Sequence, residues 1–424
     1  MESKLRDIFT PAVAVIYYGI IAVAVLFWSD GSIPGIMRYP LVTAIFLPAI
    51  FVDSRWMLPS LVTTTMVFIN LPGNQFQMQH WYYITVILIV VLLNAKEKGR
   101  ITRPLEMLPF MCLLVYMVAI DLIYGNNFTA VHKNILMALC AALLIGEDGH
   151  QAKETLPYAF IIGSLLISIA YWMNVEDYLF QYNRDNLTRS FWTDPNYQGS
   201  TIGIGTMLAV YLLVNGKAEN LWQKVLCVAT VAISLITLFA LASRGAMLAV
   251  AVTIVMLVIF SGKSNGVKII TFVLCSAIVI YAYTQSYMDL FIYRMHERTL
   301  MTGAKRFIVW QDKWDYFLRD RNLLHWLFGI GKDASFQLGT IGGVNGFAMH
   351  NQFLASLLNY GIVGLAALLA LFWLPIKKAA KGNKMSTALL VLYPCIVFLT
   401  LEPLTIGFVT FYFLYLYIYI QATR

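Results

Sequence analysis

Long apolar runs alternate with short polar segments along nearly the whole chain. Most runs approach the roughly 20 residues that an α-helix needs to cross the hydrocarbon core of a bilayer, whereas the short runs 56–71 and 134–146 fit either a span or a re-entrant, half-spanning segment. The runs lie at residues 11–28, 37–52, 56–71, 81–94, 105–124, 134–146, 156–173, 199–214, 221–241, 245–260, 267–284, 351–375, 386–401 and 404–421. The pattern therefore predicts an all-α, polytopic integral membrane helical bundle with roughly 12–14 transmembrane helices.

The composition excludes a soluble fold. Hydrophobic residues make up 59% of the 424 residues and charged residues only 12%, with a mean hydropathy of +0.70. Typical soluble domains carry about 25% charged residues. Because the apolar runs leave little room for a separate soluble unit, we expect residues 1–424 to form a single membrane domain.

The distribution of basic residues predicts the orientation in the membrane. The net charge is +8, and Lys and Arg gather in short segments that fall on one side if every run spans. These segments are residues 95–103, the region around Lys153, and residues 215–224, 261–268 and 375–384. The positive-inside rule makes this side cytoplasmic, together with both termini. Topology thus explains the basic charge, and we expect no nucleic-acid partner.

The opposite, periplasmic face receives residues 174–198, a tight turn at Ser243–Arg244, and a large loop at residues 285–350. The large loop interleaves aromatic and leucine side chains with charges at roughly helical spacing, which predicts amphipathic helices lying on the membrane surface. The glycine-rich residues 329–350 close this loop and permit movement. Chemistry is expected on this face.

Two groups of cations are candidate ligands for an anion. Arg244 interrupts an apolar stretch, where a guanidinium costs about 2.5–3.5 kcal/mol at the centre of a membrane helix. Its side chain either extends to the membrane interface or binds an anion through two parallel guanidinium hydrogen bonds, and we favour anion binding. The loop adds a second group, which fits either anionic lipid head groups or a sugar diphosphate. Its members are Arg294, Arg298, Lys305 and Arg306.

His350 precedes the apolar run at residues 351–375 and so lies at the outer mouth of the bundle. A histidine there either acts as a proton acceptor or forms hydrogen bonds at the start of the helix. The other histidines lack metal-ligand spacing, and no DxD-like pair of carboxylates is present. The five cysteines lie inside apolar runs, and we assign them no chemical role. We therefore expect neither a metal nor a cofactor.

Five motifs together resemble the O-antigen polymerase and O-antigen ligase superfamily. They are FWTDPNYQG at 191–199, ASRGAML at 242–248, TGAKRFIVW at 302–310, WLFGIGKD at 326–333 and HNQFLASLLNYGIVG at 350–364. The resemblance covers about the C-terminal 240 residues. It implies a metal-independent glycosyltransferase in the bacterial inner membrane that uses an undecaprenyl-diphosphate-linked glycan as donor and inverts the anomeric carbon.

The resemblance also implies roles for individual residues. Arg244 and Arg306 would hold the diphosphate, and His350 would activate the acceptor hydroxyl as the catalytic residue. In this chain Ala304 and Lys305 separate Gly303 from Arg306, so Lys305 shares or replaces the role of Arg306.

A glycan groove is expected beside these residues, although Asp194 and Asn196 are expected to cap a helix that starts near Tyr197. The candidate groove residues are Arg189, Trp192, Tyr197, Trp310 and Asn351.

The sequence is compatible with three functions. A polymerase would join one lipid-linked glycan to another, a ligase would deliver the glycan to the lipid A core, and we favour the polymerase. A lipid or solute transporter is the alternative of a different class, but the two halves of the chain show no matching interrupted spans. Membrane lipids are expected contacts, and a chain-length regulator is a further partner of polymerases.

Overall fold

The computed structural model describes residues 17, 19–20, 44, 47, 56–70, 108–124, 130–173, 194–260, 265–289, 292, 306–320, 322–331, 349–406 and 409–423. In these ranges the regular structure is helical throughout, which confirms the all-α fold. The helices are α4 (Met57–Asn70), α6 (Leu108–Ile123), α7 (Ala130–Met173), α9 (Pro195–Val214), α10 (Leu221–Leu241), α11 (Arg244–Phe260), α12 (Asn265–Thr284), α14 (Arg306–Arg319), α15 (Leu323–Phe328), α17 (Gln352–Lys381), α18 (Met385–Leu389), α19 (Leu392–Thr400), α20 (Pro403–Ile406) and α21 (Val409–Thr423).

Several helices have the length and composition of membrane spans. Within the described residues, four are long and apolar enough to cross a bilayer, namely Lys153–Met173, Pro195–Val214, Leu221–Leu241 and Gln352–Lys381. Shorter apolar helices include α6, α11 and most of α12. The chain is therefore a polytopic membrane protein. The predicted runs at 11–28, 37–52 and 81–94 lie almost entirely outside the described residues, so the number of spans stays a prediction.

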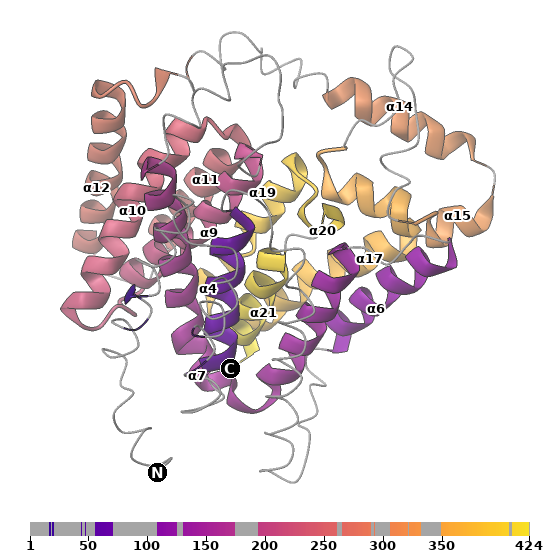
Figure 1. The fold of residues 1–424 in the computed structure, drawn as a ribbon, viewed down its shortest axis with the longest axis horizontal. Coiled ribbons are helices and arrows are strands. Elements are labelled where there is room, and N and C mark those ends of the chain that lie inside the picture. The colour runs from indigo at the N-terminus through magenta and orange to yellow at the C-terminus, as the bar shows by residue number, and fades with distance from the viewer. Residues whose placement is uncertain are drawn as a thin grey trace.

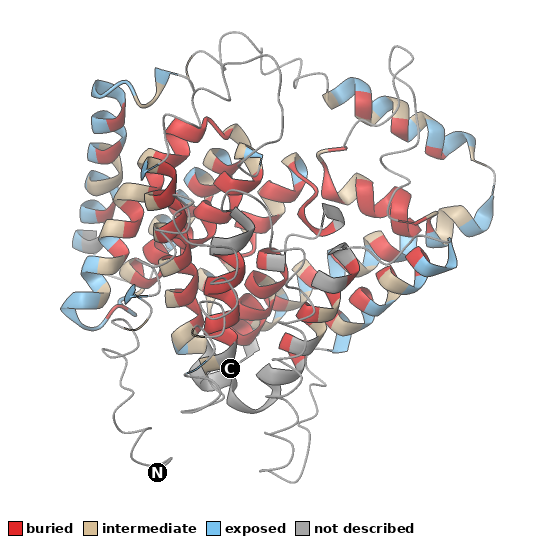
Figure 2. Ribbon diagram, viewed as in Figure 1, coloured by how far each residue is buried: buried red, intermediate tan, exposed pale blue. Residues whose placement is uncertain are grey.

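Helix α9 forms the centre of the bundle. In the most apolar stretch of α9, 94% of the residues are buried. The corresponding share is 50% in α10 and 44% in α17. It packs against α7, α10 and α11, while α17 packs against α6, α15 and α21. Figure 1 shows α10–α12 on one side of the molecule and α6, α15 and α17 on the other, with α19 and α20 between them. The buried residues concentrate in the central helices, and α12 and α14 are largely exposed (Figure 2).

Helix α7 corrects one expectation from the sequence. The polar segment around Lys153 is predicted to be a loop between two apolar runs, but the helix continues from Ala130 to Met173 without a break. Glu, Gln, Ala, Lys and Leu in this segment favour helix, and α7 also accommodates the helix-disfavouring Gly149 and Pro157, whereas the prediction followed polarity alone.

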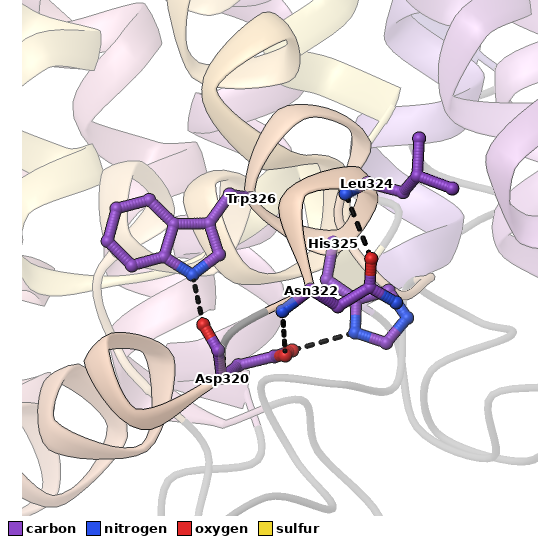
Figure 3. A network of polar contacts seen from close by, with 5 residues as sticks. All are labelled: Asp320, Asn322, Leu324, His325 and Trp326. Atoms are coloured by element: carbon purple, nitrogen blue, oxygen red, sulfur yellow. Dashed lines mark hydrogen bonds and ion pairs between the residues drawn. The ribbon is translucent and has the colours of Figure 1, made fainter.

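The loop at residues 285–350 contains α14 and α15, which meet at a polar corner (Figure 3). The carboxylate of Asp320 accepts hydrogen bonds from the backbone N–H of Asn322, at 2.9 Å, and pairs with His325 Nδ1 at 2.7 Å. The indole N–H of Trp326 donates to the backbone oxygen of Asp320, and its ring stacks on Phe317. This corner fixes α14 against α15, and α15 in turn packs on α17.

Two glycines allow α15 to approach α17 closely. Gly329 ends α15 with φ +77°, and Gly361 kinks α17 with φ +69°. A Cβ on Gly361 would lie 2.3 Å from the backbone oxygen of Leu327, and one on Gly329 would lie 2.2 Å from that of Asn359. Two of the five motifs, WLFGIGKD and HNQFLASLLNYGIVG, thus meet in space, and their glycines are required by backbone contact.

We expect Gly361→Ala to destabilise the protein strongly, because alanine disfavours this φ by about 1–3 kcal/mol and its methyl group strikes backbone that cannot move aside. Gly382→Ala is the matched control, since Gly382 has φ −85°. The atom nearest to an added Cβ there lies at 3.5 Å, an ordinary contact distance, so nothing would have to shift. Thermal melting in detergent should show a large drop for the first variant only. Equal melting temperatures would contradict the close approach.

Candidate functional site

His350 lies in a turn that several segments hold in place. Its backbone is left-handed, with φ +50°, a conformation that a non-glycine residue adopts only when its surroundings enforce it. The backbone N–H of His350 donates to Glu402 Oε1 at 3.2 Å. Next to it, the indole N–H of Trp310 donates to the backbone oxygen of Met349 at 2.8 Å. These bonds attach the turn both to α14 and to the link between α19 and α20.

Gln352 adds a third attachment. Its side-chain oxygen accepts a hydrogen bond from the backbone N–H of Leu404 at 2.8 Å, and its amide donates to Ser356. Gln352 is fully buried. The start of α17 is therefore joined to the start of α20 at two points, Glu402 and Leu404, which leaves the His350 turn little freedom.

Arg306 and Arg244 meet at the same place from different helices. Arg306 NH1 donates to the backbone oxygen of Thr400 at 3.0 Å. The second residue of α11, Gly245, packs so closely on Thr400 that an added Cβ would lie 2.4 Å from its hydroxyl oxygen. Thr400 thus lies between the starts of α11 and α14, and the charge of Arg244 acts on Arg306.

Both helices begin with an arginine: α11 starts at Arg244 and α14 at Arg306. The N-terminus of a helix carries about half a positive charge and unpaired N–H groups, and it favours phosphate. Neither helix has an acidic residue in its first turn to neutralise this charge. Two helix ends and two guanidinium groups therefore produce a strongly anion-attracting region.

The positive charge of Arg306 also affects the protonation of His350. Burial and the guanidinium of Arg306 lower the pKa of His350 below its ordinary 6.5, with the carboxylate of Asp194 opposing the shift. Burial and the charge of Arg244 likewise lower the pKa of Arg306. His350 is therefore a neutral imidazole at pH 7, the form that accepts a proton. Its buried Nδ1 has no hydrogen-bond partner among the described residues.

The remaining predicted residues fall into three groups. Asp194 caps α9 by accepting from the backbone N–H of Asn196 at 2.7 Å, as expected. Tyr197 is buried within electrostatic reach of Arg306, Asp194 and Glu402. Asn351 caps α17, and its side-chain oxygen accepts two backbone N–H groups. The predicted residues Lys305, Arg189 and Trp192 lie outside the described residues.

Sequence reasoning missed the parts played by Glu402 and Lys313. Glu402 belongs to none of the five motifs, yet its carboxyl group holds the His350 turn. Lys313 shares the buried face of α14 with Trp310, is 1% exposed, and has no hydrogen-bond partner for Nζ in the described structure. Burial lowers the pKa of Lys313, and the carboxylates of Asp312 and Glu402 act against that shift. A helical face with cations at positions 306 and 313 was the available sequence pattern.

Several buried polar atoms have no hydrogen-bond partner within the described residues. Besides His350 Nδ1 and Lys313 Nζ, they include both amide atoms of Gln198 and the hydroxyl of Ser243. The hydroxyl of Ser243 would lie 3.0 Å from a Cβ on Gly199, the neighbour of Gln198 in sequence. Buried polar groups are almost always satisfied in proteins, so Gln198 and Ser243, which neighbour Tyr197 and Arg244 in sequence, are candidates for contact with a ligand.

The buried carboxyl of Glu402 makes a prediction about stability. Burial raises the pKa of Glu402 to about 7 from an ordinary 4.5, against the hydrogen bonds from His350 and Met349 and the charge of Lys313. The folded protein therefore binds this proton more tightly than the unfolded chain, and the resulting stability, complete below pH 4.5, is lost as the pH rises to 7. Glu402→Gln should melt close to wild type at pH 5 and above it at pH 8. A melting difference that does not change with pH would contradict the raised pKa.

Within the ranges that the structure describes, no three His, Cys, Asp or Glu side chains form a group able to hold a metal ion. The acidic groups of the site, Asp194 and Glu402, are instead surrounded by cations and hydrogen-bond donors. The cations and N–H groups of this site suit the binding of an anion.

One family model matches part of the chain. Residues 229–369 match the model of a family described as O-antigen ligase, a segment that contains Arg244, Arg306 and His350. No curated protein gives a significant match to the chain. This match confirms the resemblance to the O-antigen polymerase and ligase superfamily, whose members are glycosyl-transferring membrane enzymes.

Proposed function

We propose that the chain transfers a glycan from undecaprenyl diphosphate to the hydroxyl of an acceptor sugar, with inversion and without a metal. The observation that carries this proposal is the meeting of two arginine-bearing helix starts at Thr400, beside a histidine in a left-handed turn on which the charge of Arg306 acts. We further propose that this end of one membrane domain faces the periplasm of the inner membrane, with both chain termini in the cytoplasm.

The reaction assigns each group a task. An oxygen of the acceptor hydroxyl attacks the anomeric carbon, and the bond from that carbon to the diphosphate oxygen breaks. The hydroxyl proton passes to His350, and the bonding electron pair stays on the diphosphate. Arg244 and Arg306 bind that diphosphate, and the charge that grows on the departing oxygen makes their attraction stronger in the transition state than in the ground state.

Glu402 and Gln352 act as positioning residues in this proposal, because they bond to the backbone around His350. Trp310 borders the turn and offers aromatic surface to a sugar ring. Tyr197 is buried beside Glu402 and supports the turn from inside. Lys305, Arg189, Trp192 and Asn351 remain proposed neighbours of the substrate. The acceptor is a second lipid-linked glycan if the chain is a polymerase, which we favour, and the lipid A core if it is a ligase.

The test uses purified full-length protein in detergent with an undecaprenyl-diphosphate-linked repeat unit and a chelator. Parallel reactions include or omit the lipid A core as acceptor. A ladder of lengthening lipid-linked glycans without the core would identify the polymerase, and product only on the core would identify the ligase. Dependence on an added divalent metal would contradict the proposed mechanism. Absence of transfer to either acceptor would favour the transporter.

A further inference from the structure

Three lysines meet at the end of the bundle opposite to the His350 turn, around Gln421 near the end of α21. The ammonium group of Lys217, in the link between α9 and α10, donates to Gln421 Oε1 at 3.2 Å and to the Tyr211 hydroxyl at 2.6 Å. Lys384, between α17 and α18, donates to the backbone oxygen of Gln421 at 3.4 Å. The Gln421 amide donates to the backbone oxygen of Lys153, in α7, at 2.9 Å.

Among the side chains that the structure describes, this cluster holds more positive than negative charge. The charges of Lys384 and Lys217 both act on Lys153, and Glu154 is the one acid among the causes that affect it. Burial also lowers the pKa of Lys217. Among the described residues, none of the three ammonium groups forms an ion pair with a carboxylate.

Capping of α21 explains only part of the arrangement. Cations near a helix C-terminus are favoured, and the bond from Lys384 to Gln421 satisfies one orphan carbonyl there. An ammonium group has three donors. Lys217 uses two of them and Lys384 uses one, and Lys153 Nζ uses none within the described structure. Donors therefore remain on all three lysines for an anion that is shared between them.

The surroundings indicate the depth of lipid head groups. Leu221 and Trp222 begin α10 close to Lys217 and are 73% and 80% exposed. Met385 follows Lys384 directly and is also exposed. Exposed Trp beside Lys is typical of the boundary between hydrocarbon and water, where lipid phosphates lie. A soluble phosphate would have no use for this apolar border.

We propose that Lys153, Lys217 and Lys384 bind the phosphate group of an anionic phospholipid, with Gln421 and Tyr211 fixing the lysines in place. One phosphodiester charge placed between three ammonium groups supplies the missing counter-charge. The acyl chains would lie along the exposed apolar surface at the start of α10. The site is separate from the His350 turn and does not depend on the proposed transferase activity.

The test measures binding of phosphatidylglycerol and of zwitterionic phosphatidylcholine to the full chain in non-ionic detergent by native mass spectrometry. The double variant Lys217→Gln/Lys384→Gln should bind phosphatidylglycerol roughly thirty-fold more weakly than wild type, since each lysine near an anionic head group contributes about fivefold. The control Lys224→Gln/Lys377→Gln loses the same two charges from exposed positions at this end and should bind like wild type.

Lys217→Arg/Lys384→Arg keeps the charge, and retained lipid binding there would show that the glutamine variant fails through charge rather than through misfolding. Equal loss in the control double variant, or no preference for phosphatidylglycerol in wild type, would overturn the site. Displacement of the lipid by millimolar glycerol phosphate would overturn the lipid as the source and assign the lysines to a soluble phosphate.

Discussion

Replacement of His350 by alanine is expected to lower the rate of glycan transfer by roughly 10²–10⁴-fold, the usual contribution of a positioned general base. The imidazole is neutral at pH 7 because burial and Arg306 lower its pKa, so it is ready to accept the proton of the acceptor hydroxyl. Donor binding should change little, because the diphosphate contacts the arginines. Single-turnover rates with purified protein and a labelled lipid-linked glycan would measure the loss.

His325→Ala is the matched control, since His325 is also half-buried in the loop but pairs with Asp320 at the α14–α15 corner. Its transfer rate should stay near that of wild type. An equal loss in both variants would indicate that histidine removal disturbs the loop as a whole, and would contradict the role given to His350.

The pH dependence provides a second readout for His350. Protonation removes the base, so the rate should fall as the pH drops through the His350 pKa, which lies below 6.5. Glu402, with a pKa of about 7, touches the same turn and titrates nearby. Lys313, Arg306 and Asp194 also act on one or the other of these two groups. The Glu402→Gln variant should therefore still lose activity as the pH falls. If the rate of this variant no longer fell at low pH, the titrating group would be Glu402 instead of His350.

Long apolar runs predicted most of the helices in the part of the chain that the structure describes. The run at 221–241 is α10, residue for residue, and the interruption predicted at Ser243–Arg244 marks the turn into α11, which begins at Arg244. The cap at Asp194 was readable because an Asp before Pro is a common start of a helix. Each of these features depends on neighbours within a few residues, which is the range over which sequence patterns act.

The contacts that build the site depend on distant residues and were not readable in the same way. His350 and Glu402 are 52 positions apart, and the bond between Arg306 and Thr400 joins residues 94 apart. The sequence named Arg244, Arg306 and His350 only through a family resemblance, and it gave no reason to connect Glu402 or Lys313 with them. Helix packing brings these residues together, and the packing of many spans cannot be derived from their hydrophobicity.

Replacement of Arg306 by alanine should lower transfer by roughly 10²–10³-fold, the usual effect of removing one donor that stabilises charge in a transition state. Arg306→Lys should recover only part of the rate, because an ammonium group keeps the charge but loses the planar fork that matches two phosphate oxygens. Arg244→Ala should resemble Arg306→Ala. The double variant should be less impaired than the product of the single effects, because both cations serve one diphosphate.

Arg306 also bonds to the backbone of Thr400, so a structural role must be separated from diphosphate binding. Inhibition by the product undecaprenyl diphosphate achieves this, because it requires the diphosphate contact but no chemistry. Arg306→Ala should weaken this inhibition at least tenfold, while Arg319→Ala, at the exposed end of the same helix, should leave it unchanged. Unchanged inhibition in Arg306→Ala, combined with a lowered melting temperature, would show that Arg306 holds α14 in place and that another group binds the diphosphate.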